Sequence, residues 1–238
     1  MTTCILAGII FFFAGLLQGL TGFGSALLAI PLLTLLMDIK AAVPLCMLNG
    51  LALTCYLSLH LRTHLDRKKI LPLLVGSLPG IVAGASLLTR VDSHLLRVAI
   101  GLLLISFILY RLFLRPRSLR LAGWWGYIAG FFTGAIGAAL SAGGPPAIIY
   151  TTLTGWNKEE IRATLSGFFV ISGLITVIVH AMTGVSTRAT LSCFLLTVPF
   201  VLLGTICGSR MSGRFSQTAY LRLVHYLLLA MGVMMIRG

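Results

Sequence analysis

The chain has 238 residues, of which 58% are hydrophobic and 10% charged, and its mean hydropathy is +1.03. One water-soluble core cannot bury so many apolar side chains, so the composition excludes an ordinary soluble domain and predicts an integral membrane protein. The formal net charge of +13 would suit nucleic acid only if the basic residues gathered on one face, but they are distributed between apolar runs. We therefore expect the lipid bilayer, and not nucleic acid, as the surrounding partner.

The first apolar segment, at about residues 5–36, is interrupted. Its stretch GLLQGLTGFG, residues 15–24, carries four glycines and the polar side chains Gln18 and Thr21. No basic n-region and no small-residue cleavage site marks a removable signal peptide, so we expect the segment to remain in the protein. It is too long for one untilted crossing at 1.5 Å per residue and too short for two. We predict a re-entrant hairpin that turns near mid-membrane at the glycines.

Continuous apolar stretches follow, and each is long enough to cross the hydrocarbon layer, which takes roughly 17–25 residues. The first three lie at about 43–61, 70–89 and 95–114. A second interrupted segment, at about 123–154, contains GFFTGAIGAALSAGGPP and predicts a second hairpin, whose returning helix should start near Gly144 because prolines follow it. Three more stretches lie at about 162–183, 189–209 and 219–236.

The two halves of the chain resemble each other. The glycines and proline at 15, 19, 22 and 31 recur 115 positions later, and SLPGIVAG (77–84) matches TVPFVLLG (197–204). We predict two membrane repeats, residues 1–116 and 117–238, that together form one domain. The predicted fold is an all-α polytopic membrane protein of two inverted repeats, each a re-entrant or broken helical hairpin followed by three transmembrane helices.

The basic residues decide between an inverted and a parallel arrangement. If each interrupted segment is re-entrant, thirteen Lys and Arg residues fall on one side and five on the other, whereas single crossings give ten and eight. Cytoplasmic loops are enriched in Lys and Arg, which favours the inverted arrangement. It places the basic loops 62–69, 111–122 and 210–222 in the cytoplasm and both termini outside.

Helix breaks inside a membrane predict a cavity, because unpaired backbone amides survive there only where protein or water satisfies them. Inverted repeats with paired broken helices build midplane sites in many secondary transporters, and the half-helix amino termini there point at anionic groups. Glycines at the breaks allow turn angles and close approach to a ligand, and Thr21 or Ser25 is placed to cap the returning helix. The candidate ligand-binding residues are Gln18, Gly19, Thr21, Gly22, Gly24, Ser25, Asn49, Gly137, Ser141, Gly143, Gly144, Pro145, Arg162 and Ser166.

Several of these residues have an equally good structural explanation. Asn49 and Ser166 occupy similar places in the two repeats, where each either lines the cavity or bonds to a neighbouring helix. Arg162 either reaches inward or lies at the cytoplasmic rim. Glycines four apart, as at 76, 80 and 84 and at 126, 130 and 134, are typical of helix packing.

The positions of the charged residues indicate the sign of the ligand. All five acidic residues fall in predicted loops, so a cation would lack its usual counter-charge in the membrane, whereas an anion remains feasible. His180 and His225 fit either a proton relay or, more commonly, packing. The five cysteines show neither metal spacing nor a paired framework and are interpreted as small buried side chains. No metal and no cofactor is expected.

The segments GLLQGLTGFGSALLAIPLL and GAIGAALSAGGPPAIIYTTLTG resemble the two signature segments of the TauE/SafE sulfite-exporter family, and the likeness covers nearly the whole chain. The resemblance implies a single transport domain that exports small sulfur-containing anions such as sulfite or an organosulfonate. It places the glycine-rich segments at positions 19, 22, 24 and 31, and at 134, 137 and 143–146. The first copy departs from the denser glycine run of many members, which weakens the assignment of its contacts.

The sequence therefore predicts an exporter in a bacterial inner membrane with both termini periplasmic. It would work by alternating access around a midplane site, with a small anionic substrate as its partner and a homodimer as one possible assembly. A channel-like passive pathway is the alternative for the same site. An intramembrane enzyme is disfavoured because the spans hold no carboxylate and no clustered histidines. A purely structural membrane protein would leave the two matched breaks unexplained.

Overall fold

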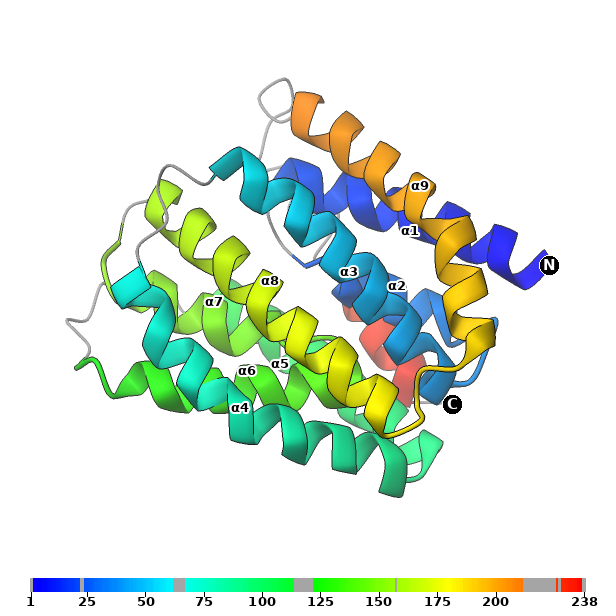
Figure 1. Ribbon diagram of the computed structural model, residues 1–238, viewed down its shortest axis with the longest axis horizontal. Helices are drawn as coiled ribbons and strands as arrows, with labels where there is room; N and C mark the ends of the chain where they lie inside the picture. Colours follow the sequence, from blue (N-terminus) through cyan, green and yellow to red (C-terminus); the bar gives the residue numbers. More distant parts are fainter. Residues whose placement is uncertain are drawn as a thin grey trace.

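The computed structural model describes residues 2–21, 24–61, 67–113, 122–156, 158–211, 226 and 228–236. These residues form helices joined by short turns, with no strand among them (Figure 1). The helices are α1 (Thr2–Thr21), α2 (Ala26–Leu33), α3 (Ile39–Leu61), α4 (Arg67–Arg90), α5 (Ser93–Phe113), α6 (Trp125–Leu140), α7 (Gly144–Leu153), α8 (Lys158–Met182) and α9 (Arg188–Met211), followed by a helix over 228–236.

Six of the described helices, α1, α3, α4, α5, α8 and α9, are long and apolar enough to cross a membrane. Together with the helical architecture, this confirms the predicted all-α polytopic membrane fold. Many large apolar side chains, such as Leu71, Val82 and Leu195, are exposed on the outside of the bundle, as lipid contact requires. Within the predicted span 219–236, residues 219–225 and 227 lie outside the described residues, and residues 228–236 are helical.

Both predicted helix breaks are present. α1 ends at Thr21 and α2 begins at Ala26, while α6 ends at Leu140 and α7 begins at Gly144, the predicted start of the returning helix. In Figure 1, α7 turns back along α6. The first arms, of 20 and 16 residues, are longer than a half-crossing at 1.5 Å per residue, and the returning arms have only 8 and 10 residues. The asymmetry arises because the helix breakers stand late in each segment.

Helix α1 packs closely along α9 through glycines. A Cβ atom at Gly15 would collide with the carbonyl oxygen of Val201, and a Cβ atom at Gly204 would collide with the carbonyl oxygen of Phe12. Small residues allow backbones to approach in this way, and such contacts are common between membrane helices. The first helix of the chain is therefore held in place by α9, which lies in the last quarter of the sequence.

Helices α4 and α6 pack in the same manner and in the same register. A Cβ atom at Gly130 would collide with the carbonyl oxygen of Leu73, and one at Gly76 with that of Tyr127. Each α6 residue stands 115 positions after its α1 counterpart, and each α9 residue 128 positions after its α4 counterpart. These contacts support the predicted duplication and confirm that the glycine rows at 76–84 and 126–134 pack helices.

The register of the match between α4 and α9 differs from the sequence expectation. The similarity of residues 77–84 to 197–204 implies a displacement of 120, which pairs Gly84 with Gly204. The helix contacts instead make Gly76 the counterpart of Gly204 and Gly80 the counterpart of Gly208. Glycines recur every four residues in both helices, so a sequence match can slip by two turns without losing its pattern.

The helix pair α1 and α9 runs in the opposite direction to the pair α4 and α6. In Figure 1, α1 and α9 run from right to left, whereas α4 and α6 run from left to right. The first described helix begins and the last one ends at the same end of the bundle. This geometry agrees with the predicted inversion, although the symmetry relation itself stays a prediction.

Two cysteines form a disulfide, which corrects the interpretation of all five as small buried side chains. Cys4 of α1 and Cys193 of α9 are bonded, with their Cα atoms 5.4 Å apart. Their separation of 189 residues gave no spacing signal in the sequence. The pairing became visible only once α1 and α9 were side by side. Among the described residues Cys46, Cys55 and Cys207 are free, and of these only Cys46 is fully buried.

Candidate functional site

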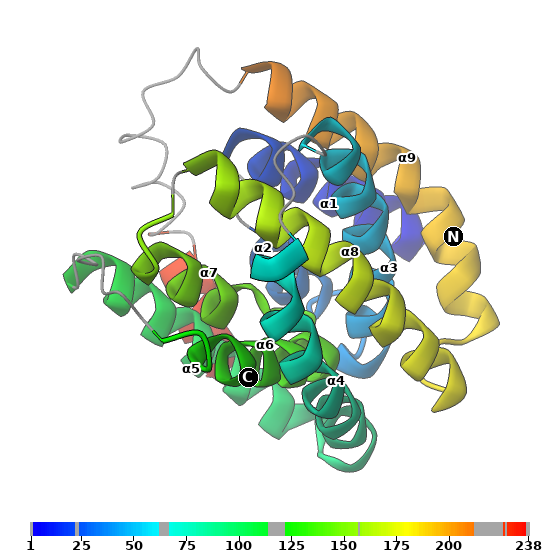
Figure 2. The ribbon, with the colours of Figure 1, turned by 60° about the vertical axis from the view of Figure 1, so that its left-hand side comes forward.

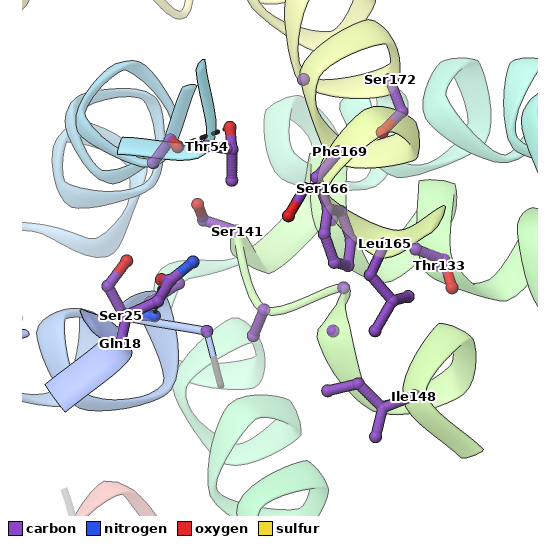
Figure 3. A pocket seen from close by; sticks show the side chains of 18 of the residues that line it. Gln18, Ser25, Thr54, Thr133, Ser141, Ile148, Leu165, Ser166, Phe169 and Ser172 are labelled. Atoms are coloured by element: carbon purple, nitrogen blue, oxygen red, sulfur yellow. Dashed lines mark hydrogen bonds between the residues drawn. The ribbon is translucent and has the colours of Figure 1, made fainter. Parts of the chain in front are cut away.

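A cavity of about 480 Å³ lies between the two helix breaks, with α3 and α8 completing its walls (Figure 3). Figure 2 shows α3 and α8 side by side from a second direction. Its described lining residues are uncharged. Its polar lining side chains are Gln18, Ser25, Thr54, Thr133, Ser141, Thr152, Ser166, Ser172 and Thr176.

The second break is shaped by a left-handed residue and two prolines. Ser141 ends α6 with φ = 55°, and its amide donates a hydrogen bond to the carbonyl of Gly137 over 2.8 Å. A Cβ atom at Gly143 would collide with the carbonyl oxygen of Thr133, so the turn closes tightly against α6. Within the described chain, the amides of residues 142–144 donate to no protein acceptor. Residues 142–144 line the cavity, so we expect their amides to be available to a ligand.

The prolines limit what this helix end offers. An α-helix normally leaves its first four N–H groups without an intrahelical partner, but Pro145 and Pro146 have no N–H. Of the four open amides expected at the start of α7, only those of Gly143 and Gly144 remain, and the amide of Ala142 before them is open as well. A ligand held here needs side-chain donors as well.

The first break is fastened by a side chain. The amide of Ser25 donates a hydrogen bond to Oε1 of Gln18, which joins the last turn of α1 to the start of α2. Because Oε1 accepts this bond, Nε2 of Gln18 points the other way, and within the described residues it has no acceptor. Ser25 stands at the N-cap of α2, but its hydroxyl makes no capping bond there. The predicted cap is thus replaced by the Gln18 contact.

Apart from Ser141, whose side chain is hydrogen-bonded to Cys46, the residues with hydroxyl groups around the cavity fall into two sets. Those of Thr54 and Ser172 donate to carbonyls of their own helices, over 2.9 Å to Gly50 and 2.8 Å to Phe168, and Thr152 and Thr176 do likewise. The hydroxyls of Ser25, Thr133 and Ser166 have no partner among the described residues. Buried polar groups are normally satisfied, so this second set is where a ligand is expected to bind.

The structure brings most of the predicted site residues together. Figure 3 shows Gln18, Ser25 and Ser141 on one side of the cavity, with Ser166 facing them from α8. The predicted residues that line the cavity are Gln18, Gly24, Ser25, Gly137, Ser141, Gly143, Gly144 and Ser166. Gly22 and the side chains of Thr21 and Arg162 lie outside the described part of the chain.

Three predicted residues lie away from the cavity lining. Asn49 is fully buried and donates to Oγ1 of Thr197 over 2.9 Å, so it joins α3 to α9 as the helix-contact interpretation requires. Gly19 faces α9, where a Cβ atom would collide with the carbonyl oxygen of Thr205. Pro145 is buried at the start of α7.

Several lining residues were missed because they look like ordinary helix residues in the sequence. Gly50 of α3 faces the cavity, and a Cβ atom there would meet nothing within 4 Å. Thr133 and Phe169 line the cavity from α6 and α8. For Gly50 the only signal in the sequence was a glycine inside a continuous span. That this glycine has no packing partner becomes visible only when the neighbouring helices are in place.

His180 supports the second break and does not line the cavity. Its Nε2 donates to the carbonyl of Ala138, over 2.9 Å, in the last turn of α6. The carbonyls at a helix end lack intrahelical partners, so this bond stabilises the broken end. His225 lies outside the described residues, and the described part of the chain contains no cluster of metal-binding side chains.

We expect Gln18→Ala to destabilise the protein, because the buried amide of Ser25 loses its acceptor. Leaving such a group unsatisfied costs about 1–3 kcal/mol. Thr54→Ala is the matched control, since the Thr54 hydroxyl only duplicates a bond within its own helix. Thermal unfolding of the purified variants should show a clear loss of Tm for Gln18→Ala alone. Equal melting temperatures would show that the Gln18 contact does not hold the hairpin.

Comparison with known proteins identifies the chain's relatives. A family model described as sulfite exporter TauE/SafE matches residues 7–235. A protein of Cupriavidus necator, described as a probable sulfite/organosulfonate exporter TauE, is 26% identical over 174 residues, which cover 71% of this chain and 68% of that protein. No solved structure matches the chain. Because the family model covers nearly every residue, including both helix breaks and the cavity between them, the chain belongs to the TauE/SafE family of sulfite exporters.

Proposed function

We propose that this protein exports a small sulfur-containing anion, sulfite or an organosulfonate, by alternating access around the cavity between the two helix breaks. The observation that carries the proposal is an uncharged cavity whose unpartnered groups include the amides of residues 142–144, Nε2 of Gln18 and the hydroxyls of Ser25 and Ser166. The name of the Cupriavidus necator relative supports sulfur anions as the substrate.

An array of donors suits an anion better than a cation. A bare charge near the bilayer centre costs several kcal/mol, and backbone amides, the Gln18 amide and hydroxyls replace part of the water shell of a sulfur oxyanion. The described lining includes no carboxylate that would bind a metal ion or an ammonium group. The same donors favour oxygen-rich anions over halides, because several oxygens can each accept a bond.

Alternating access rests on the two similar helix pairs. Each pair joins the first helix of one predicted repeat to a span of the other, α1 with α9 and α4 with α6. Between these pairs lie α3 and α8, which contact each other and both line the cavity. Movement of one pair against the other would open the cavity to each side in turn, as in other transporters of inverted repeats.

We further propose that the chain lies in a bacterial inner membrane with both termini in the periplasm. The distribution of Lys and Arg supports this orientation. The disulfide between Cys4 and Cys193 is an independent argument, since both residues lie near the amino-terminal ends of their helices, at the end of the bundle where the chain begins. Disulfides persist in the oxidising periplasm and are rare in the cytosol.

Alkaline phosphatase fusions test the orientation. We expect an active enzyme when it is fused after Gly238 and an inactive one when it is fused after Arg117, because phosphatase folds only outside the cytoplasm. Fusions of green fluorescent protein at the same positions should give the opposite pattern. Phosphatase activity at both positions, or at Arg117 alone, would contradict the proposed topology.

Transport in proteoliposomes tests the function. We expect saturable sulfite uptake that is stimulated by sulfite on the opposite side, whereas a channel would show neither saturation nor counter-exchange. Ser166→Ala should raise the sulfite concentration needed for half-maximal uptake about tenfold or more, because a hydrogen bond to a charged group contributes about 1.5–3 kcal/mol. Ser172→Ala is the matched control, since its hydroxyl is already bonded to Phe168. No flux of sulfite or of any organosulfonate would contradict the proposal.

A further inference from the structure

The cavity is much larger than an inorganic oxyanion. Its volume of about 480 Å³ falls in the range of roughly 300–1,000 Å³ that is typical of sites for organic ligands. A water molecule occupies about 30 Å³ in the liquid, and a sulfite ion replaces only a few waters. A bare sulfite ion would leave most of this space to water or empty.

Part of the remaining space is bordered by one apolar cluster. Ile148 of α7 and Leu165 and Phe169 of α8 line the cavity, together with Trp156 and Ile161, and all five belong to the same hydrophobic cluster. In Figure 3, Ile148, Leu165 and Phe169 lie on the side opposite Gln18 and Ser25. The cavity thus has the donors Gln18 and Ser25 on one side and, on the other, an apolar wall with two aromatic rings beside the hydroxyl of Ser166.

We propose that the preferred substrate of this site is a monoanionic organosulfonate with an apolar body of several carbons, an inference that rests on the proposed transport function. The sulfonate oxygens accept hydrogen bonds from Gln18, Ser25, Ser166 and the amides at residues 142–144. The carbon chain or ring packs against Leu165 and Phe169. The wall made of Ile148, Trp156, Ile161, Leu165 and Phe169 therefore determines specificity.

The net charge of the substrate narrows the class of sulfonates further. A second negative group, such as the carboxylate of sulfoacetate, would have to face the apolar wall, where an unpaired charge is costly. The ammonium group of taurine would lack a carboxylate partner among the described lining residues. Sulfonates with a second charged group should therefore bind more weakly than alkyl or aryl sulfonates of similar size.

Isothermal titration of the protein in lipid nanodiscs, with empty nanodiscs as the blank, tests this selectivity. The probes are sulfite, methanesulfonate, hexanesulfonate and sulfoacetate. Each methylene buried is worth about a fourfold gain in affinity, so hexanesulfonate should bind at least tenfold tighter than methanesulfonate. Hexyltrimethylammonium has the same tail and the opposite charge, and it should show no specific binding.

Variants assign the preference to the wall. The ratio of the methanesulfonate Kd to the hexanesulfonate Kd measures the preference for the longer chain, and Phe169→Ala should lower this ratio at least fivefold. Leu165→Ala provides a second test if the first variant does not fold. Ser166→Ala should weaken both ligands and leave the ratio close to its wild-type value. Equal affinities for the two sulfonates, or tighter binding of sulfite, would overturn the inference while leaving sulfur-anion transport intact. Failure of every sulfur anion to bind would overturn both.

Discussion

Gly50→Leu is expected to reduce transport to less than a tenth of the wild-type rate while the protein stays folded. Gly50 lies in α3 and faces the cavity, and a Cβ atom there would meet nothing within 4 Å. The leucine side chain has only the cavity to occupy. Leucine is also favoured over glycine inside a helix by about 0.8–1 kcal/mol, so the helix itself should not suffer.

Two measurements separate a filled cavity from a damaged fold. Gly50→Ala adds only one methyl group and should retain most of the transport activity. Size-exclusion chromatography and thermal unfolding should give wild-type behaviour for both variants. Wild-type flux in Gly50→Leu would show that the substrate passes elsewhere, and this would remove the basis for the assigned site.

Gly204→Ala should destabilise the protein strongly, although only one methyl group is added. Its Cβ atom would collide with the carbonyl oxygen of Phe12 and lie 3.0 Å from the amide nitrogen of Leu16. These are backbone atoms that cannot rotate away, so α1 and α9 must separate along their length. Overpacking costs about 1–3 kcal/mol where side chains can adjust, and here we expect the upper end of that range or more.

Gly76→Ala tests the same contact in the second helix pair. Its Cβ atom would collide with the carbonyl oxygen of Tyr127, which stands 115 positions after Phe12. We expect similar losses of free energy of unfolding for Gly76→Ala and Gly204→Ala, measured by titration with sodium dodecyl sulfate, and no loss for Gly50→Ala. Unequal losses would contradict the proposal that the two helix pairs are counterparts.

The sequence by itself was enough to determine the membrane class, the positions of both helix breaks and the ligand's expected charge. Apolar runs and helix breakers act locally, so α7 begins at Gly144, as the prolines after it indicate. The unequal lengths of the hairpin arms were not predicted. α1 continues to Thr21, among the glycines where the turn was predicted, and its 20 residues exceed the half-crossing that a turn near mid-membrane requires.

The partners of individual residues were decided only by the tertiary structure. Asn49 and Ser166 occupy similar places in the sequence, yet Asn49 bonds to Thr197 and Ser166 faces the cavity. The Cys4–Cys193 bond joins residues 189 positions apart, which no local spacing could indicate. Which side of a continuous apolar helix meets lipid, protein or a cavity depends on its neighbours, because the membrane supplies apolar surroundings on every side and removes the usual contrast between buried and exposed faces.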